Sequence, residues 1–297
     1  MSTKLPKVSF CLLTYNQEEY IEDAMQAAFN QDYGNMELIV SDDCSTDATV
    51  AIIRKMITEY SGNHSVRLNV NKHNIGIREN VNKVLYELSS GDIVLLAAGD
   101  DVSLPNRTSV YVNYFMAFPN VSNISCMSEE VDDKLKPLYP EKKYSNNFSL
   151  FTKEDYIMFR DFSIYSGDSR GLRRTVIESF PPLRYPEAED IFLFIRALLI
   201  GDGIFIRTPL VKRRHHQKNA SMAPFSKKIY NGHKLQVESD LKYALEKAYI
   251  DKDLYTKFLD KNIYLLDFYK LYCVPVYSSL KAFIYRVLRK LFGVIKL

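Results

Sequence analysis

Residues 93–101, Ile93-Val94-Leu95-Leu96-Ala97-Ala98-Gly99-Asp100-Asp101, form an apolar run that ends directly in two adjacent carboxylates. Neighbouring aspartates repel each other unless a cation, a ligand or solvent compensates their charge. Their oxygen atoms suit Mg2+, which usually shares such ligands with substrate phosphates. A solvated turn or a helix cap explains the same pattern. The stretch thus predicts a buried strand of a parallel sheet, followed either by a metal–diphosphate site or by a simple turn.

The composition is typical of a globular protein. The chain has 297 residues, 46% of them apolar and 25% charged, enough for one large domain or two smaller ones. A net charge of +3 argues against a nucleic-acid partner. No apolar run approaches the roughly 18 residues of a spanning helix, and no signal-peptide pattern precedes the first strand, so we expect a cytoplasmic protein. The scattered Cys11, Cys44, Cys126 and Cys273 are expected to be free thiols.

Strand and helix patterns alternate along the first third of the chain. Strands are expected at 8–13, 37–41, 66–70 and 92–96, with helices at 21–29, 45–60 and 81–88. Asn16 and Glu19 predict a capping box for the first helix. The alternation predicts an α/β fold, with a mostly parallel central sheet flanked by helices on both faces. In such sheets, ligands bind at the carboxyl ends of the strands.

Polar clusters follow all four of these strands, at 14–16, 42–47, 71–76 and 99–101. Each could be ordinary turn chemistry, but parallel strands bring all four to one edge of the sheet. No GxGxxG follows the first strand and no Walker-type loop is present, so a nucleotide would be held by side chains and a metal.

The second half of the chain is less regular. The sequence predicts a helix at 110–118, a strand at 121–127, an exposed loop at 132–147 and a flexible stretch at 163–174. Residues 191–200 are apolar almost all round and predict a buried helix that ends at Gly201. Glu189 and Asp190 stand immediately before it. They are either caps of that helix or reactive carboxylates.

Taken together, these motifs resemble those of inverting glycosyltransferases of family 2, which have the GT-A fold. The matching stretches are 8–16, 39–47, Asn74-Ile75-Gly76 with Asn80, 91–101, Glu189-Asp190 and 216–221. The resemblance covers about residues 6 to 221. It implies a catalytic domain at 1–221, with a nucleotide-binding half (1–101) and an acceptor half (102–221), and a C-terminal helical region at 222–297.

The resemblance implies a nucleotide-sugar donor, linked to UDP, GDP or dTDP. Its nucleotide-binding residues would be Thr14, Tyr15, Asn16, Glu18, Asp42, Asn74, Gly76, Asn80 and Asp100. Among them, Asp42 would accept a hydrogen bond from the base. Asp100 matches the last carboxylate of the family's DxD motif and would bind Mg2+ or Mn2+ bridging the diphosphate.

Asp101 and His216 are the other metal candidates. His216 fits the family's HxxNxS motif, although it also ends a basic segment, 212–216, that could simply be a solvated loop. The chain departs from the family at Ala98, where the first DxD acid would fall. Asp100 would then hold the ion with phosphates, water and His216, or Asp101 would contribute.

The resemblance also implies that Asp190, which matches the second residue of the family's ED pair, is the general base. Inverting transfer needs one carboxylate to take the proton of the acceptor hydroxyl. A helix N-terminus favours its ionised form. Glu189 would position Asp190 or contact acceptor hydroxyls.

The C-terminal residues 276–297 predict a basic amphipathic helix, which could lie in an anionic membrane interface or pack on protein. With the resemblance, this suggests a lipid-linked glycan acceptor, surface-polysaccharide synthesis (O-antigen or capsule) and a peripheral location at the inner face of the cytoplasmic membrane. Two alternatives remain: a non-catalytic nucleotide-sugar-binding domain, and a nucleotidyltransferase.

Overall fold

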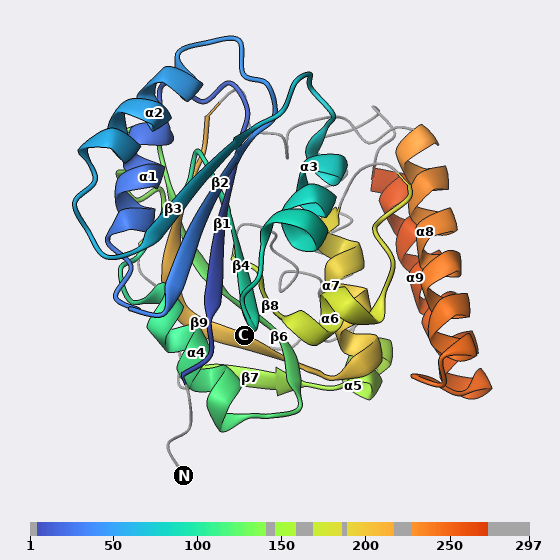
Figure 1. Ribbon diagram of the computed structural model, residues 1–297. Helices are drawn as coiled ribbons and strands as arrows, with labels where there is room; N and C mark the ends of the chain where they lie inside the picture. Colours follow the sequence, from blue (N-terminus) through green and yellow to red (C-terminus); the bar gives the residue numbers. More distant parts are fainter. Residues whose placement is uncertain (1–4, 141–145, 159–168, 186–188, 217–226, 273–297) are drawn as a thin grey trace.

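The computed structural model describes residues 5–140, 146–158, 169–185, 189–216 and 227–272. They form one nine-stranded mixed sheet in the order β3-β2-β1-β4-β8-β6-β9-β5, with β7 paired to β9 (Figure 1). The predicted helix at 276–297 lies outside the described residues. Among the helices within them, none is long and apolar enough to cross a membrane.

The strands of the sheet are β1 (Val8–Thr14), β2 (Met36–Asp42), β3 (Ser65–Val70), β4 (Ile93–Ala98), β5 (Val102–Ser103), β6 (Val121–Val131), β7 (Phe148–Phe151), β8 (Gly171–Arg173) and β9 (Asp202–Arg214). The helices are α1 (Ile21–Phe29), α2 (Thr49–Glu59), α3 (Ile77–Lys83) with the π-helical turn η1 (Val84–Leu88), α4 (Arg107–Ala117), α5 (Lys153–Met158), α6 (Arg174–Ser179), α7 (Glu189–Ile200), α8 (Lys227–Glu246) and α9 (Lys252–Tyr272).

The N-terminal half of the sheet is parallel, as the sequence predicts. β3, β2, β1 and β4 run side by side. The inner strands β1, β2 and β4 are buried on both faces, as is typical of parallel sheets. The predicted capping box is wrong, however. Helix α1 begins at Ile21 without a side-chain cap, and Asn16 lies before it with a φ of 51°. Its side chain instead accepts a hydrogen bond from the Thr46 amide at 2.8 Å.

The predicted flexible stretch at 163–174 is wrong for its last part. Gly171–Arg173 forms β8, which is antiparallel to both β4 and β6 and closes the centre of the sheet. Gly171 is required there, since a Cβ would lie 2.6 Å from the Tyr111 ring and 2.8 Å from Leu95. A three-residue strand between two partners carries too little pattern to be recognised from sequence alone.

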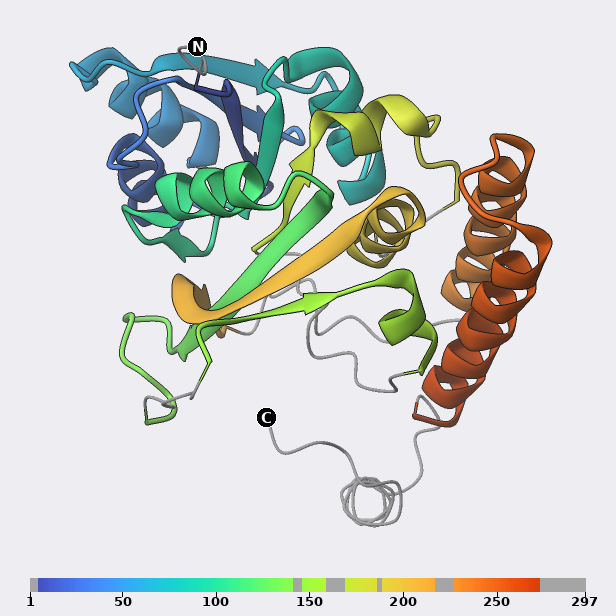
Figure 2. The same cartoon turned by 90° about the horizontal axis from the view of Figure 1, so that it is seen from below.

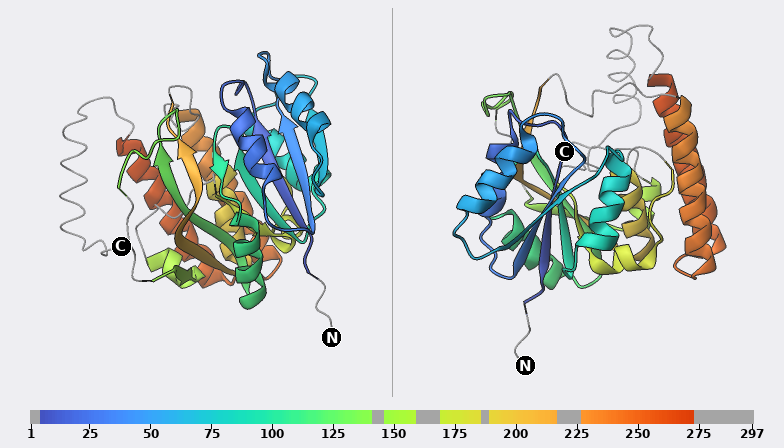
Figure 3. Two further views of the ribbon diagram at one scale, coloured as in Figure 1. Left: turned by 90° about the vertical axis from the view of Figure 1, so that its left-hand side faces the viewer. Right: turned by 45° about the horizontal axis from the view of Figure 1, so that its top comes forward.

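Two apolar layers cover the sheet. Helices α1, α2 and α4 pack on one face, and α3, η1, α6, α7 and the α8–α9 pair pack on the other (Figures 2 and 3). Helix α7 is buried almost all round, as its sequence predicts. Side chains of α8 and α9 belong to the same apolar cluster as α7 and strands β1 and β4, so these two helices pack on the domain. The boundary at 221 itself stays a prediction.

A buried ion pair joins α7 to α8. Arg196 donates to both carboxylate oxygens of Asp240, at 2.8 and 2.7 Å, and also to the carbonyl of Pro181 at 2.7 Å. We expect Arg196→Leu to lower the free energy of unfolding by about 3–5 kcal/mol, because it leaves Asp240 buried without its cation. The double variant Arg196→Leu/Asp240→Leu should recover part of the loss in a urea titration. Equal stability of wild type and Arg196→Leu would contradict this reading.

Glu37 makes stability depend on pH. Burial raises the pKa of Glu37, but hydrogen bonds from Lys7, Ser9 and Ser90 outweigh it and bring the pKa from 4.5 to about 2. A lowered folded-state pKa stabilises the protein above the unfolded-state value, and this stabilisation is lost as the pH falls toward about 2. We expect Glu37→Gln to cost roughly 2–3 kcal/mol at pH 7. The difference from wild type should shrink below about pH 4 in unfolding titrations; a difference independent of pH would refute it.

Candidate functional site

The ends of β1, β2 and β4 meet at one edge of the sheet. Thr14 pairs with Asp42 across β1 and β2, and the Gly99 amide donates to the Leu13 carbonyl at 2.8 Å. A Cβ on Gly99 would lie 2.4 Å from Gln17 Oε1 and 2.9 Å from Thr14 Cβ. Among the described residues, Thr14 Oγ1 and Gln17 Oε1 are buried without a hydrogen-bond partner. The predicted polar clusters therefore do converge here.

The loop after β2 is tied to the loop after β1. The Asp42 carboxylate accepts hydrogen bonds from the amide and hydroxyl of Ser45, at 2.8 and 2.5 Å, and Asp42 has no exposed surface. A direct bond from Asp42 to a base thus requires the Ser45 hydroxyl to turn away. Glu18 accepts from the Ala48 amide at the start of α2, whereas Tyr15 is exposed beside this loop.

Asp43 organises the third loop, whereas the sequence analysis assigned a role only to its neighbour Asp42, as an acceptor of a hydrogen bond from the base. Its carboxylate accepts hydrogen bonds from the amides of Ile75 and Gly76, at 2.9 and 2.8 Å. Gly76 has a φ of 83°, which favours glycine. Asn74 accepts a second bond from the Gly76 amide at 3.1 Å. In the sequence, only the pair of adjacent acids, Asp42 and Asp43, could have pointed to this role of Asp43.

Asn80 lies beneath this loop. Its side chain is buried and bonds to the hydroxyl and carbonyl of Ser41, at 2.6 and 3.1 Å, and to Asn71 at 3.2 Å. Asn80 therefore supports the loop after β3 from below, and its amide is engaged within the protein.

Asp100 and His216 lie together, although they are far apart in the sequence. His216 Nε2 is 3.0 Å from Asp100 Oδ2, and both side chains are largely buried. The His216 ring packs against Tyr20 in a tilted arrangement, with 4.5 Å between ring centroids. This is the pair that the family resemblance places at the metal.

The basic segment 212–216 is mostly strand β9 and not a solvated loop. Arg214 is buried. Its amide donates to the Asp101 carboxylate at 2.9 Å, and its guanidinium contacts Asp23 at 2.7 Å and the Asp100 carbonyl at 3.0 Å. Arg214 thus supports the Asp100 loop from behind. Asp101 takes part in this support by accepting the hydrogen bond from the Arg214 amide.

The donor set fits a divalent ion that relies on its substrate for further ligands. Within the described ranges, no group of three or more His, Cys, Asp or Glu residues could hold a metal by itself. Asp100 and His216 supply one carboxylate oxygen and one imidazole nitrogen. Mg2+ usually takes one or two carboxylates and completes its shell with phosphates and water, so the residues present are compatible with it.

Asp190 begins the buried helix α7. Its Oδ1 accepts a hydrogen bond from the Ile191 amide at 2.8 Å, so it contacts the helix N-terminus, where negative charge is favoured. The Asp190 carbonyl accepts a bond from Arg170 at 3.2 Å, another residue that sequence reasoning missed. Glu189 is the first residue of α7, and its side chain lies outside the described set.

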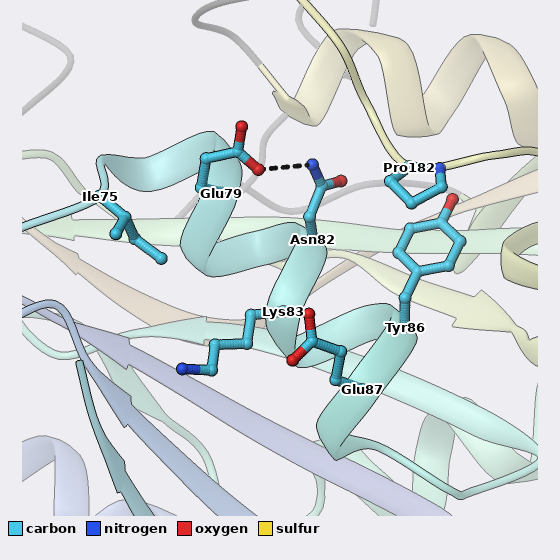
Figure 4. A pocket seen from close by; sticks show the side chains of 7 residues that line it. All are labelled: Ile75, Glu79, Asn82, Lys83, Tyr86, Glu87 and Pro182. Carbon is cyan, nitrogen blue, oxygen red and sulfur yellow. Dashed lines mark hydrogen bonds between the residues drawn. The ribbon is translucent and has the colours of Figure 1, made fainter. Parts of the chain in front are cut away.

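A separate surface pocket of about 410 Å³ lies along α3 and η1 (Figure 4). It is lined by Ile75, Glu79, Asn82, Lys83, Tyr86, Glu87 and Pro182. Only Ile75 belongs to the loops described above, so this pocket flanks the sheet edge and does not contain the Asp100–His216 pair.

The sheet-edge motifs fall within a known protein family. The model of glycosyl transferase family 2 matches residues 9–180, more than half of the chain. The protein belongs to this family. The match confirms the resemblance read from the motifs.

Relatives with curated descriptions share part of the chain. The putative glycosyltransferase EpsE of Bacillus subtilis is 34% identical over 109 residues, which cover 37% of this chain and 38% of EpsE. The putative colanic acid biosynthesis glycosyl transferase WcaA of Escherichia coli is 28% identical over 158 residues, 51% of this chain and 54% of WcaA. The match thus spans about two fifths to one half of these relatives.

Solved structures confirm the fold. Residues 1–349 of Staphylococcus aureus TarS, in complex with UDP-GlcNAc, superpose with a TM-score of 0.67 and 18% identity, over 86% of this chain and 71% of that one. The mannosyltransferase PcManGT of Pyrobaculum calidifontis, in complex with GDP-Man and Mn2+, superposes with a TM-score of 0.54 and 16% identity, over 96% of this chain and 81% of that one. The architecture is the predicted GT-A fold, with a mixed, mostly parallel sheet flanked by helices.

Proposed function

We propose that this protein is an inverting glycosyltransferase that moves a sugar from a nucleotide-sugar donor to a hydroxyl group. The observation that carries the proposal is the Asp100–His216 contact of 3.0 Å. It supports the proposal because a carboxylate and an imidazole, two groups able to bind a metal, lie together at the sheet edge where this class of fold binds ligands.

The nucleotide would lie across the ends of β2, β1 and β4. Thr14, Tyr15 and Asn16 would line the nucleoside pocket, with Glu18 and Asp42 shaping its floor. Asn74 and Gly76 would border it, while Asn80 would act from below by holding their loop. Support comes from the hydrogen bonds that join these loops to one another.

The diphosphate would lie at the end of β4. Asp100 and His216 would hold Mg2+ or Mn2+, and the bound ion would supply the positive charge that stabilises the leaving diphosphate. PcManGT was solved with GDP-Man and Mn2+, which supports a metal of this kind. Asp101 would keep the Asp100 loop in place through the Arg214 amide.

Asp190 would act as the general base. Its carboxylate would take the proton of the acceptor hydroxyl while that oxygen forms a bond to the anomeric carbon. The bond from the anomeric carbon to the diphosphate oxygen would break, so the nucleoside diphosphate leaves with the electron pair and the configuration inverts. Glu189, next in the chain, would orient the acceptor or Asp190.

The acceptor would be a glycan hydroxyl, lipid-linked in our proposal, in the synthesis of a bacterial surface polysaccharide such as O-antigen or capsule. The description of WcaA, which names colanic acid biosynthesis, supports a polysaccharide. The basic segment 276–297 would place the protein at the anionic inner face of the cytoplasmic membrane.

A panel of nucleotide sugars tests the function. Thermal unfolding with UDP-, GDP- and dTDP-linked sugars in Mg2+ or Mn2+ should show stabilisation by one donor class, and that donor should then release nucleoside diphosphate. Stabilisation without release in the presence of candidate acceptors would favour a binding domain. Diphosphate released from a nucleoside triphosphate would favour a nucleotidyltransferase.

A further inference from the structure

Arg170 connects the strand that leads to Asp100 with the helix that begins at Asp190. It is fully buried, directly before β8. Its carbonyl accepts a hydrogen bond from the Leu96 amide of β4 at 2.8 Å, four residues before Asp100. Its guanidinium donates to the main-chain carbonyl of Asp190 at 3.2 Å. One residue thus bonds to both elements of the proposed site.

Two more contacts fix the direction of the guanidinium. Nη1 donates to Asn123 Oδ1 of β6 at 2.8 Å. The guanidinium carbon lies 5.3 Å from the centroid of the Phe194 ring, one turn after Asp190 on α7. Arg170 therefore contacts a carbonyl of the first turn of α7 and an aromatic ring of the next turn. Because the guanidinium is a rigid planar fork, these contacts fix orientation as well as distance.

Helix α7 has extensive apolar contacts besides those with Arg170. The helix already buries apolar side chains on nearly all sides, among them Phe192, Leu193 and Leu198. A buried guanidinium is costly to desolvate unless it is well paired. What Arg170 adds to α7 is a defined position of its first turn relative to β4 and β6.

We propose that Arg170 is a positioning residue that sets the place of Asp190 relative to Asp100. The proposal rests on the proposed function, since it assigns Asp190 as the base. Reacting atoms must lie about 3–3.5 Å apart and in line, and a displacement of about 1 Å can cost about a hundredfold in rate. A small shift of the first turn of α7 would therefore slow transfer without weakening donor binding at β4.

The test compares Arg170→Met and Arg170→Lys with Arg173→Met. Arg173 lies three residues further along, at the end of β8, but its guanidinium contacts the carbonyls of Val121 and Phe118 and the Phe115 ring. Arg173→Met thus removes a comparable side chain without touching α7. For each variant, kcat and donor KM come from nucleoside diphosphate release with the donor selected by the panel. Calorimetry gives the Kd of that nucleoside diphosphate in Mg2+, and thermal unfolding gives Tm.

We expect Arg170→Met to lower kcat about 10- to 100-fold, with donor KM and nucleotide Kd within about threefold of wild type. Lysine keeps the charge but cannot hold Asn123 and Asp190 in one fork, so Arg170→Lys should lower kcat by more than about threefold. Arg173→Met should keep kcat within about threefold of wild type, even if its Tm falls as far as that of Arg170→Met.

Equal kcat in the Arg170 and Arg173 variants would overturn the proposal. A loss of nucleotide affinity as large as the loss of kcat in Arg170→Met would overturn it too. If Arg170→Met does not fold, Arg170→Lys decides by the same comparison. The proposed function fails separately, if Asp190→Asn still transfers sugar or if wild type binds no nucleotide. An inactive Asp190→Asn beside a fully active Arg170→Lys removes only the positioning role.

Discussion

Asp190→Asn should lower kcat for sugar transfer by about 10²- to 10⁴-fold while the protein still binds its donor. The asparagine amide is close in size to the carboxylate and can still accept a hydrogen bond from the Ile191 amide, as Asp190 does at 2.8 Å. It cannot take a proton from the acceptor hydroxyl. Steady-state release of nucleoside diphosphate, together with calorimetry of donor binding, measures the two quantities separately.

Asp202→Asn provides the matched control. Asp202 is the first residue of β9, just after the other end of α7, and burial raises its pKa. The same change of carboxylate to amide there should leave kcat within about twofold of wild type. Full transfer activity in Asp190→Asn would remove Asp190 as the base and reopen the question of Glu189.

Asp100→Asn should abolish the effect of Mg2+ or Mn2+ on donor binding and lower kcat/KM by about 10³-fold. The Asp100 carboxylate contacts His216, and Ala98 supplies no second acid to replace it. His216→Ala should have a smaller effect, since phosphate and water oxygens can complete the shell of the ion. Titration of the metal at fixed donor concentration, followed by nucleoside diphosphate release, measures both variants.

Asp92→Asn is the control for Asp100→Asn. Asp92 precedes the same strand at its opposite end, where it accepts a hydrogen bond from the Lys7 amide at 2.8 Å. Its loss should cost stability only. Equal activity of wild type in excess chelator and in Mn2+ would remove the metal role from Asp100.

The sequence predicts the parallel half of the sheet well, because each strand carries its own apolar run and a turn signal. The contact between Asp100 and His216 was expected from the family motifs alone, since no local pattern links residues so far apart. The strands and the family motifs are each short, contiguous stretches of sequence. Each can be interpreted without knowing which residues it contacts in the folded protein.

The supporting residues could not be found in this way. Arg214 has the sequence context of a solvated basic segment, and its burial depends on Asp23, 191 residues away. Arg170 stands next to a three-residue strand whose partners come from β4 and β6. Asn16 has the sequence of a helix cap but bonds to Thr46 of another loop. In each case, a tertiary partner decides between local alternatives.

Calorimetric titration of the full chain with UDP-, GDP- and dTDP-linked sugars, in Mn2+ and in excess chelator, tests the donor site most directly. We predict that one donor class binds in Mn2+, that chelation weakens this binding, and that Asp100→Asn removes the difference between the two conditions. The absence of binding by every nucleotide sugar and nucleoside diphosphate, or an identical metal response in Asp100→Asn, would contradict the assignment of this sheet edge as the donor site.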